Sequence, residues 1–147
     1  MSGKITFKSK PLTLIGKTIQ KGSRAPEFSA TTVDLSEARL KDYEGKIKVI
    51  TSFLSLDTPV CDLQVKEFNK RAASLSDNVV VIGISVDLPF AQKRFCQANN
   101  IERVVTLSDY KTQAFGINYG LFIKELHLLA RAVLIIDAVN TVRYVQL

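Results

Sequence analysis

Residues 48–61 read KVITSFLSLDTPVC and predict a buried strand that passes through a short polar turn into a helix. The run over 47–53 is rich in β-branched and aromatic residues, which is typical of a buried strand. Thr58 is a good N-cap residue, and Pro59 then takes the first helical position, where its fixed φ fits and its missing N–H costs nothing. We therefore expect Cys61 in the first turn of a helix over 59–73.

Cys61 has two interpretations at this position. Unpaired backbone N–H groups and the positive end of the helix dipole favour an anion, so a thiolate forms readily there, and the Thr58 hydroxyl is close enough to assist. Alternatively the cysteine is a small core residue, because one apolar helix face carries Cys61, Val65, Phe68 and Ala72. The spacing alone leaves both interpretations open.

Cys96 is the second of the two cysteines and lies in a further predicted helix, over 89–99. The apolar stripe of that helix is expected at Leu88, Ala91, Phe95 and Ala98, which places Cys96 at its edge and partly accessible. Two cysteines are too few for a disulfide scaffold, and the lack of CxxC or zinc-like spacing argues against a structural metal site. Two unrelated thiols remain possible, and so does a pair that cycles between dithiol and disulfide; the accessible second thiol favours the cycling pair.

The rest of the chain alternates strands and helices. An N-terminal hairpin is expected from 5–7 and 12–15, and the last turn, 137–140, has an asparagine where positive φ is needed. Such an order predicts a mixed sheet flanked by helices, with right-handed parallel crossovers. The remaining predicted elements are strands 79–85 and 104–107, a short helix near 111–116, and a strand pair over 131–136 and 141–146.

The stretch 55–64, SLDTPVCDLQ, resembles the active-site loop of the thiol peroxidases, the atypical two-cysteine branch of the peroxiredoxins. The resemblance extends through 22–28, 86–96, 119–120 and 128–133 and so spans nearly the whole chain. It implies an α/β thioredoxin-like fold, with a mixed central sheet flanked by helices and an added N-terminal β-hairpin. It also implies one domain over 1–147.

The resemblance implies a role for each matching residue. Cys61 corresponds to the peroxidatic cysteine, Cys96 to the resolving cysteine, and Thr58 to the hydroxyl that bonds to peroxide or thiolate. Arg131 corresponds to the guanidinium beside the sulfur, and Gln64 to the side chain that orients it. These roles agree with the chemistry, since a permanent cation stabilises a thiolate and polarises the O–O bond.

Two features depart from the family pattern. The position of Leu54 is normally a proline that shields the thiolate and shapes the pocket; leucine supplies apolar cover there but does not fix φ, so reduced activity is expected. The sequence also stops after a predicted strand, where family members continue into a helix. The absence of that C-terminal helix is expected to leave apolar surface uncovered.

The resemblance implies an enzyme, a thioredoxin-dependent peroxidase that reduces hydrogen peroxide and organic hydroperoxides. It implies a Cys61 sulfenic acid, a Cys61–Cys96 intramolecular disulfide and recycling by thioredoxin, with no cofactor and with the family's usual homodimer. The alternative is a redox-sensing or binding module with weak or no turnover, which Leu54 and the missing C-terminal helix would explain. A thiol–disulfide exchange enzyme is disfavoured because CxxC is missing.

Composition limits the remaining classes of function. The chain has 147 residues, 46% hydrophobic and 23% charged, enough for one buried core. Its net charge of +6 comes from scattered lysines and arginines rather than from a tract, so no nucleic-acid partner is expected. Without a long apolar run or a signal-peptide pattern in 1–21, we expect no membrane partner and a cytoplasmic location.

Overall fold

The computed structural model describes residues 3–7 and 10–147, which form two sheets and three α-helices. The larger sheet has the strand order β11-β10-β5-β6-β7-β3-β4 and the smaller one β1-β2-β8-β9. The larger sheet comprises β3 (Ser29–Thr32), β4 (Glu37–Arg39), β5 (Ile47–Ser52), β6 (Val79–Ser85), β7 (Val104–Ser108), β10 (Ala132–Ile136) and β11 (Val142–Gln146).

The centre of the larger sheet is a βαβαβ unit, as the sequence predicts. Strand β5 pairs in parallel with β6, and β6 with β7. Helix α1 (Pro59–Ala72) connects the first pair and α2 (Pro89–Ala98) the second. Each of these elements lies within two residues of its predicted bounds. The expected thioredoxin-like arrangement, a mixed sheet flanked by helices, is confirmed.

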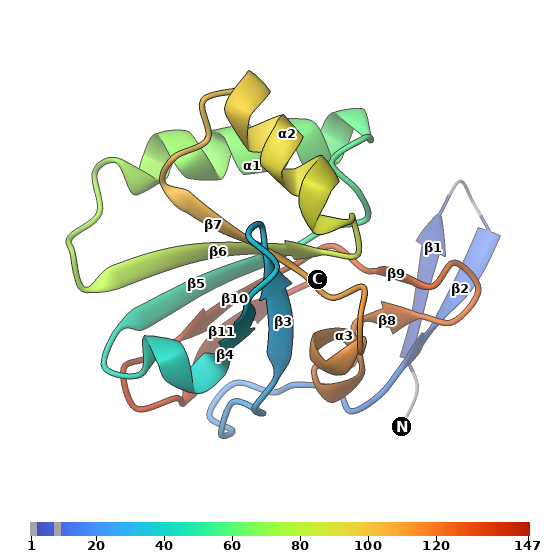
Figure 1. Cartoon of the computed structure of the whole chain (residues 1–147). Coiled ribbons are helices and arrows are strands. Elements are labelled where there is room, and N and C mark those ends of the chain that lie inside the picture. The colour runs from blue at the N-terminus through green and yellow to red at the C-terminus, as the bar shows by residue number, and fades with distance from the viewer. Residues whose placement is uncertain (1–2, 8–9) are drawn as a thin grey trace.

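Both faces of the central strands are covered, which explains their nearly continuous apolar sequence. Figure 1 shows α1 and α2 together on one face of the larger sheet and α3 (Ala114–Asn118) on the other side. Neighbouring residues alternate between two cores, so Val49 and Val81 pack under α1 and α2 while Ile50 and Ile82 face the opposite core. The cysteines belong to the core beneath α1 and α2.

The N-terminal hairpin is confirmed and forms half of the smaller sheet. Strand β1 (Gly3–Phe7) pairs antiparallel with β2 (Lys10–Ile15), and residues 8 and 9 of the predicted turn lie outside the described residues. Two short strands, β8 (Phe122–Ile123) and β9 (Leu128–Leu129), complete the sheet and were not predicted. Figure 1 shows this sheet beside one end of the larger one.

The predicted C-terminal strand pair is also confirmed. Strand β10 pairs antiparallel with both β5 and β11. Asn140 in the connecting turn has φ of 65°, the positive value that its position requires. Its side-chain oxygen also accepts a hydrogen bond of 2.6 Å from Lys48 Nζ, which ties the turn to β5. This pairing brings the segment before β10, with Arg131, to the end of β5.

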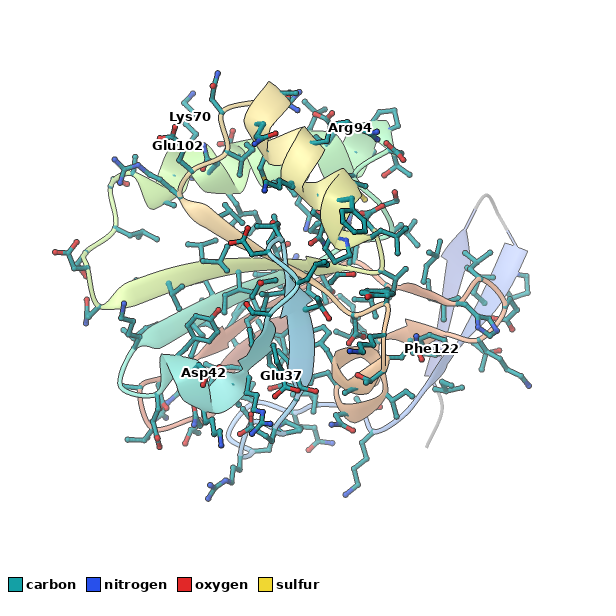
Figure 2. All side chains as sticks on the ribbon, in the orientation of Figure 1. Glu37, Asp42, Lys70, Arg94, Glu102 and Phe122 are labelled. Carbon is teal, nitrogen blue, oxygen red and sulfur yellow. The ribbon has the colours of Figure 1, made fainter. Side chains whose placement is uncertain are left out.

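Charged side chains are spread over separate elements of the surface. In Figure 2, Glu37 lies on β4 and Asp42 on the 3₁₀ helix η1 (Leu40–Tyr43). Lys70 lies on α1, Arg94 on α2 and Glu102 in the segment that follows α2. Most of the ion pairs join residues of one segment, such as Lys66 with Asp62 within α1. The charge thus follows the scattered pattern seen in the sequence.

The buried face of α2 differs from the predicted stripe. Gln92 is fully buried, whereas Leu88 is 52% exposed and Ala98 is also exposed. Gln92 Nε2 donates hydrogen bonds of 2.9 Å to Leu107 O and 3.2 Å to Ser85 Oγ. These bonds satisfy the amide nitrogen of Gln92, while its Oε1 is buried without a partner among the described residues. The hydrophobic pattern alone therefore predicted the wrong face of the helix.

Helix α3 begins three residues later than the predicted short helix near 111–116. Gln113, its N-cap, has left-handed φ of 55°, so the helix cannot extend further back. The carboxylate of Asp109, at the end of β7, instead accepts hydrogen bonds from the N–H groups of Phe115 (3.0 Å) and Gly116 (2.8 Å). A buried side chain therefore fixes the first turn.

Burial of Asp109 predicts a pH-dependent stability. Burial raises the pKa of Asp109 to about 6 from 3.8, against the opposing effect of the Gly116 and Phe115 hydrogen bonds. The native protein therefore binds more protons than the unfolded chain between pH 4 and 6, and the stability that this gives is lost as pH rises through 6. The free energy of unfolding contributed by this group should be about 1 kcal/mol higher at pH 5 than at pH 7.

Urea unfolding of the wild type and of Asp109→Asn at pH 5 and 7 measures this contribution. The wild type should gain stability relative to the variant on acidification, since the variant lacks the titrating carboxyl. Equal pH dependence in both proteins would contradict the assignment.

Candidate active site

The start of α1 has the predicted backbone but a different capping contact. Thr58 is the N-cap, with extended φ and ψ of −100° and 141°, and Pro59 follows at the first helical position. The Thr58 hydroxyl does not cap the helix; it donates to Ser55 O at 2.8 Å. Within the part of the chain that the structure describes, the N–H groups of Val60 and Cys61 then have no acceptor. These two donors are available to an anion.

Cys61 occupies the first turn of α1 and is 3% exposed. It packs in the core beneath the helices with Phe53, Leu56 and Val65. The apolar face that would make Cys61 a core residue is thus present, since Val65 is buried as well. Burial alone therefore does not separate a reactive from a structural cysteine.

The cavity at Cys61 does bear on that choice. A cavity of about 370 Å³ reaches the cysteine, which is large enough for a small organic molecule. Thr58 and Arg131 supply polar groups to its lining, and Leu54 supplies apolar cover as expected from the sequence. The remaining lining residues are Leu12, Pro59, Val60, Ile123, Ala130 and Leu147. Cys61 therefore lies on a cavity that has an apolar wall and is also lined by Arg131.

Part of this wall comes from the smaller sheet and was missed by sequence reasoning. Leu12 lies on β2 and Ile123 on β8, and the two strands pair with each other. Ala130 lies between β9 and β10 and accepts a hydrogen bond of 2.7 Å through its carbonyl from Ser52 Oγ on β5. The predicted N-terminal hairpin was the sequence signal for this sheet. Its partner strands β8 and β9 have only two residues each, too few to be recognised in the sequence.

Gln64 and Arg131 line one cavity, although no hydrogen bond joins them in the structure. This is a second cavity, next to the one at Cys61. Gln64 Nε2 donates to Thr51 Oγ1 on β5, while Gln64 Oε1 is buried and has no partner within the described residues. Arg131 is exposed. The unpaired amide oxygen of Gln64 is an acceptor suited to a guanidinium. The pairing of Gln64 with Arg131 that the sequence suggests therefore stays a proposal.

Cys96 belongs to the same core as Cys61 but faces β7. It is half-buried, as expected, and its sulfur lies 3.7 Å from Thr106 Oγ1. Burial raises the pKa of the Cys96 thiol, and the hydrogen bond with Thr106 offsets part of this effect. Both cysteines are free thiols in the structure. In this packed arrangement Cys96 is therefore held as a poorly ionised thiol.

Two further observations concern metals and membranes. Among residues 3–7 and 10–147, no three His, Cys, Asp or Glu side chains are placed to share a metal ion. The described helices are all too short or too polar to cross a bilayer.

Comparison with known proteins agrees with this geometry. The profile of the AhpC/TSA family matches residues 21–145. The crystal structure of a peroxiredoxin-like protein from Aquifex aeolicus superimposes with a TM-score of 0.91 at 41% identity, covering 98% of this chain and 85% of that one. A thiol peroxidase from Chromobacterium violaceum has the same fold, with a TM-score of 0.87 at 23% identity over 97% of this chain and 84% of its own. Fold and site together define a peroxiredoxin-type protein.

Curated relatives narrow the assignment. The thiol peroxidase of Streptococcus pneumoniae (strain ATCC BAA-255 / R6) is 48% identical over 97% of this chain and 86% of its own length. The thiol peroxidase of Oceanobacillus iheyensis is 49% identical with the same coverage of both chains. The chain belongs to the AhpC/TSA family and, within it, to the thiol peroxidases.

Proposed function

We propose that this thiol-dependent peroxidase reduces hydrogen peroxide and organic hydroperoxides at Cys61. The observation that carries the proposal is the position of the Cys61 thiol on a cavity of about 370 Å³, together with the Thr58 hydroxyl and the Arg131 guanidinium. The apolar lining suits the organic part of a hydroperoxide, and the two polar groups suit its O–O end. The proposed reaction requires no metal and no other cofactor.

In the first half-reaction, the Cys61 thiolate attacks the distal peroxide oxygen. An S–O bond forms as the O–O bond breaks, and the leaving oxygen takes a proton to become water or an alcohol. Arg131 stabilises the charge that develops on the leaving oxygen. Because Thr58 has its hydroxyl proton on Ser55 O, its oxygen is free to accept a hydrogen bond from the peroxide O–H.

In the second half-reaction, Cys96 condenses with the Cys61 sulfenic acid. The S–S bond forms, the S–O bond breaks and the hydroxyl leaves as water. Burial raises the pKa of Cys96, so its thiolate forms more easily once α2 or the first turn of α1 loosens and admits water. We therefore infer that these segments open locally when the Cys61–Cys96 disulfide forms.

Thioredoxin, or a dithiol carrier like it, then reduces the disulfide through a mixed disulfide. Apolar side chains near the starts of α1 and α2 are exposed and suit a protein partner; they are Val60 (56%), Leu63 (66%), Leu88 (52%) and Phe90 (67%). The proposal also includes a single domain over 1–147, a homodimer, and the cytoplasm, where such carriers keep thiols reduced.

The proposal is tested by peroxide consumption coupled to NADPH oxidation, with thioredoxin and thioredoxin reductase. Hydrogen peroxide and an organic hydroperoxide are compared at equal concentrations. Turnover that depends on all three components is expected with both. Failure to consume either peroxide, with the Cys61–Cys96 disulfide still forming slowly, would favour the redox-sensing alternative.

Replacing Leu54 with proline is expected to raise the rate of peroxide reduction about two- to fivefold. The Leu54 N–H has no acceptor within the described residues, so proline removes no hydrogen bond there. Its fixed φ reduces the conformational entropy that the loop loses on ordering, an effect of about 0.4–1 kcal/mol. The measurement is kcat/KM for hydrogen peroxide.

Leu54→Ala is the control, because it shortens the side chain without fixing φ. A gain with proline that alanine does not reproduce would show that preorganisation limits this loop. A tenfold loss with proline would contradict the prediction and show that the backbone at 54 needs another φ.

A further inference from the structure

The carboxylate of Asp87 connects the segments that lead into the two cysteine-bearing helices. Asp87 lies in the loop between β6 and α2, two residues before Pro89. Its Oδ1 accepts a hydrogen bond of 2.6 Å from Ser55 Oγ, and its Oδ2 accepts one of 2.9 Å from Leu56 N. Ser55 and Leu56 form the turn that precedes Cys61. One side chain therefore spans two loops that are far apart in sequence.

The contact with Ser55 continues directly to the active site. Ser55 Oγ accepts a hydrogen bond of 3.1 Å from Asp57 N, and Ser55 O accepts bonds from Thr58 N (3.1 Å) and Thr58 Oγ1 (2.8 Å). Thr58 is the N-cap of α1 and lines the Cys61 cavity. The orientation of the Thr58 hydroxyl thus depends on a turn that Asp87 holds.

A second set of bonds ties Asp87 to α2. Ser85 Oγ donates to Asp87 Oδ2 at 2.6 Å and accepts from the fully buried Gln92 at 3.2 Å. Gln92 lies one helical turn before Cys96. Ser108 Oγ on β7 also donates to Asp87 O at 2.5 Å. On this side the Asp87 carboxylate is therefore held by Ser85, which Gln92 of α2 contacts in turn, and the Asp87 backbone is held by β7.

We propose that Asp87 is a positioning residue that clamps the turn before Cys61 to the start of the Cys96 helix. With the clamp closed, Thr58 and Cys61 hold the arrangement that attacks peroxide. Release of the clamp loosens the same turn and admits Cys96 to the sulfenic acid. The inference rests on the proposed function for its kinetic consequences, but the clamp itself is a property of the fold and can be tested separately.

Asp87→Ala tests the clamp without any peroxide chemistry. Iodoacetamide should alkylate Cys61 about tenfold faster in the variant than in the wild type. Opening of the turn exposes the Cys61 side chain, which is otherwise 3% exposed. Amide hydrogen exchange measured by mass spectrometry should accelerate in peptides covering 54–62 and not in those covering 132–146. Equal acceleration everywhere, or none, would overturn the proposal.

Peroxide kinetics then separate positioning from general destabilisation. In single-turnover reactions with hydrogen peroxide, Asp87→Ala should oxidise Cys61 about tenfold more slowly, while the lifetime of the sulfenic acid, trapped with dimedone, should shorten severalfold. A purely structural role would not speed up one step while slowing the other. Changes of both steps in the same direction would overturn the proposal.

Two further variants keep these tests interpretable. Asp57→Ala removes a carboxylate of the same charge from the turn that Asp87 contacts, but the Asp57 carboxylate accepts no hydrogen bond within the described residues. All rates should therefore stay within about twofold of wild type. Asp87→Asn should fall between wild type and Asp87→Ala, since one amide oxygen still accepts from Leu56 N, and it replaces the alanine variant if that does not fold. If wild type shows no peroxide-dependent oxidation of Cys61, the proposed function fails while alkylation and exchange still decide on the clamp.

Discussion

Cys61→Ser is expected to lower kcat/KM for hydrogen peroxide by at least about a thousandfold. A serine hydroxyl remains protonated at neutral pH, whereas the attacking species in a peroxidase of this kind is a thiolate. Among the residues that the structure describes, no histidine lines the Cys61 cavity to act as a base for the hydroxyl. The measurement is the NADPH-coupled rate with thioredoxin and its reductase, at several peroxide concentrations.

Cys96→Ser is the matched variant, because it makes the same sulfur-to-oxygen change in the same core. This variant should consume about one equivalent of peroxide per chain and then stop in the thioredoxin-coupled assay. Its product should be a sulfenic acid on Cys61 that dimedone traps. Thermal unfolding of both variants controls for the loss of a buried sulfur.

The pair of results distinguishes the possible mechanisms. Continued turnover of Cys96→Ser with thioredoxin would show that a carrier reduces the sulfenic acid directly, which contradicts a resolving role for Cys96. Residual turnover of Cys61→Ser near the wild-type rate would remove Cys61 from the first half-reaction. We expect both variants to lose turnover, and only Cys96→Ser to have its Cys61 oxidised once by peroxide.

Local sequence was sufficient to place Cys61 on its helix. Thr58 and Pro59 have strong preferences for the N-cap and first helical positions, and these preferences depend only on neighbouring backbone groups. The same holds for Asn140, whose left-handed φ is a property of one turn. The positions of α1 and of the C-terminal turn therefore follow from the chain itself.

Contacts between distant segments were much less predictable. The amide nitrogen of the buried Gln92 donates to Ser85 and to a β7 carbonyl, and no hydrophobic pattern encodes such partners. The wall of the Cys61 cavity depends on β8, which has only two residues and exists through pairing with β2. Asp87 stood within a recognised motif, yet its function as a link between two loops is visible only once those loops are folded together.

Arg131→Met is expected to lower the rate constant for oxidation of Cys61 by hydrogen peroxide about a hundredfold. Arg131 is the arginine that lines the Cys61 cavity, and a fixed cation near the reacting atoms stabilises both the attacking thiolate and the leaving oxygen. Removal of one such group commonly costs about two orders of magnitude in rate. Single-turnover loss of the Cys61 thiol, followed by mass spectrometry, measures this step without thioredoxin.

Arg143→Met provides the matched control for charge. Arg143 lies on β11 and pairs with Asp137 at 2.7 Å, so its replacement removes the same charge without altering the lining of the cavity. Its rate constant should stay within about twofold of wild type. Arg131→Lys should recover only part of the loss, because an ammonium keeps the charge but not the planar set of donors. Equal losses in Arg131→Met and Arg143→Met would mean that the net field of the protein, rather than a guanidinium at the sulfur, assists the attack on peroxide.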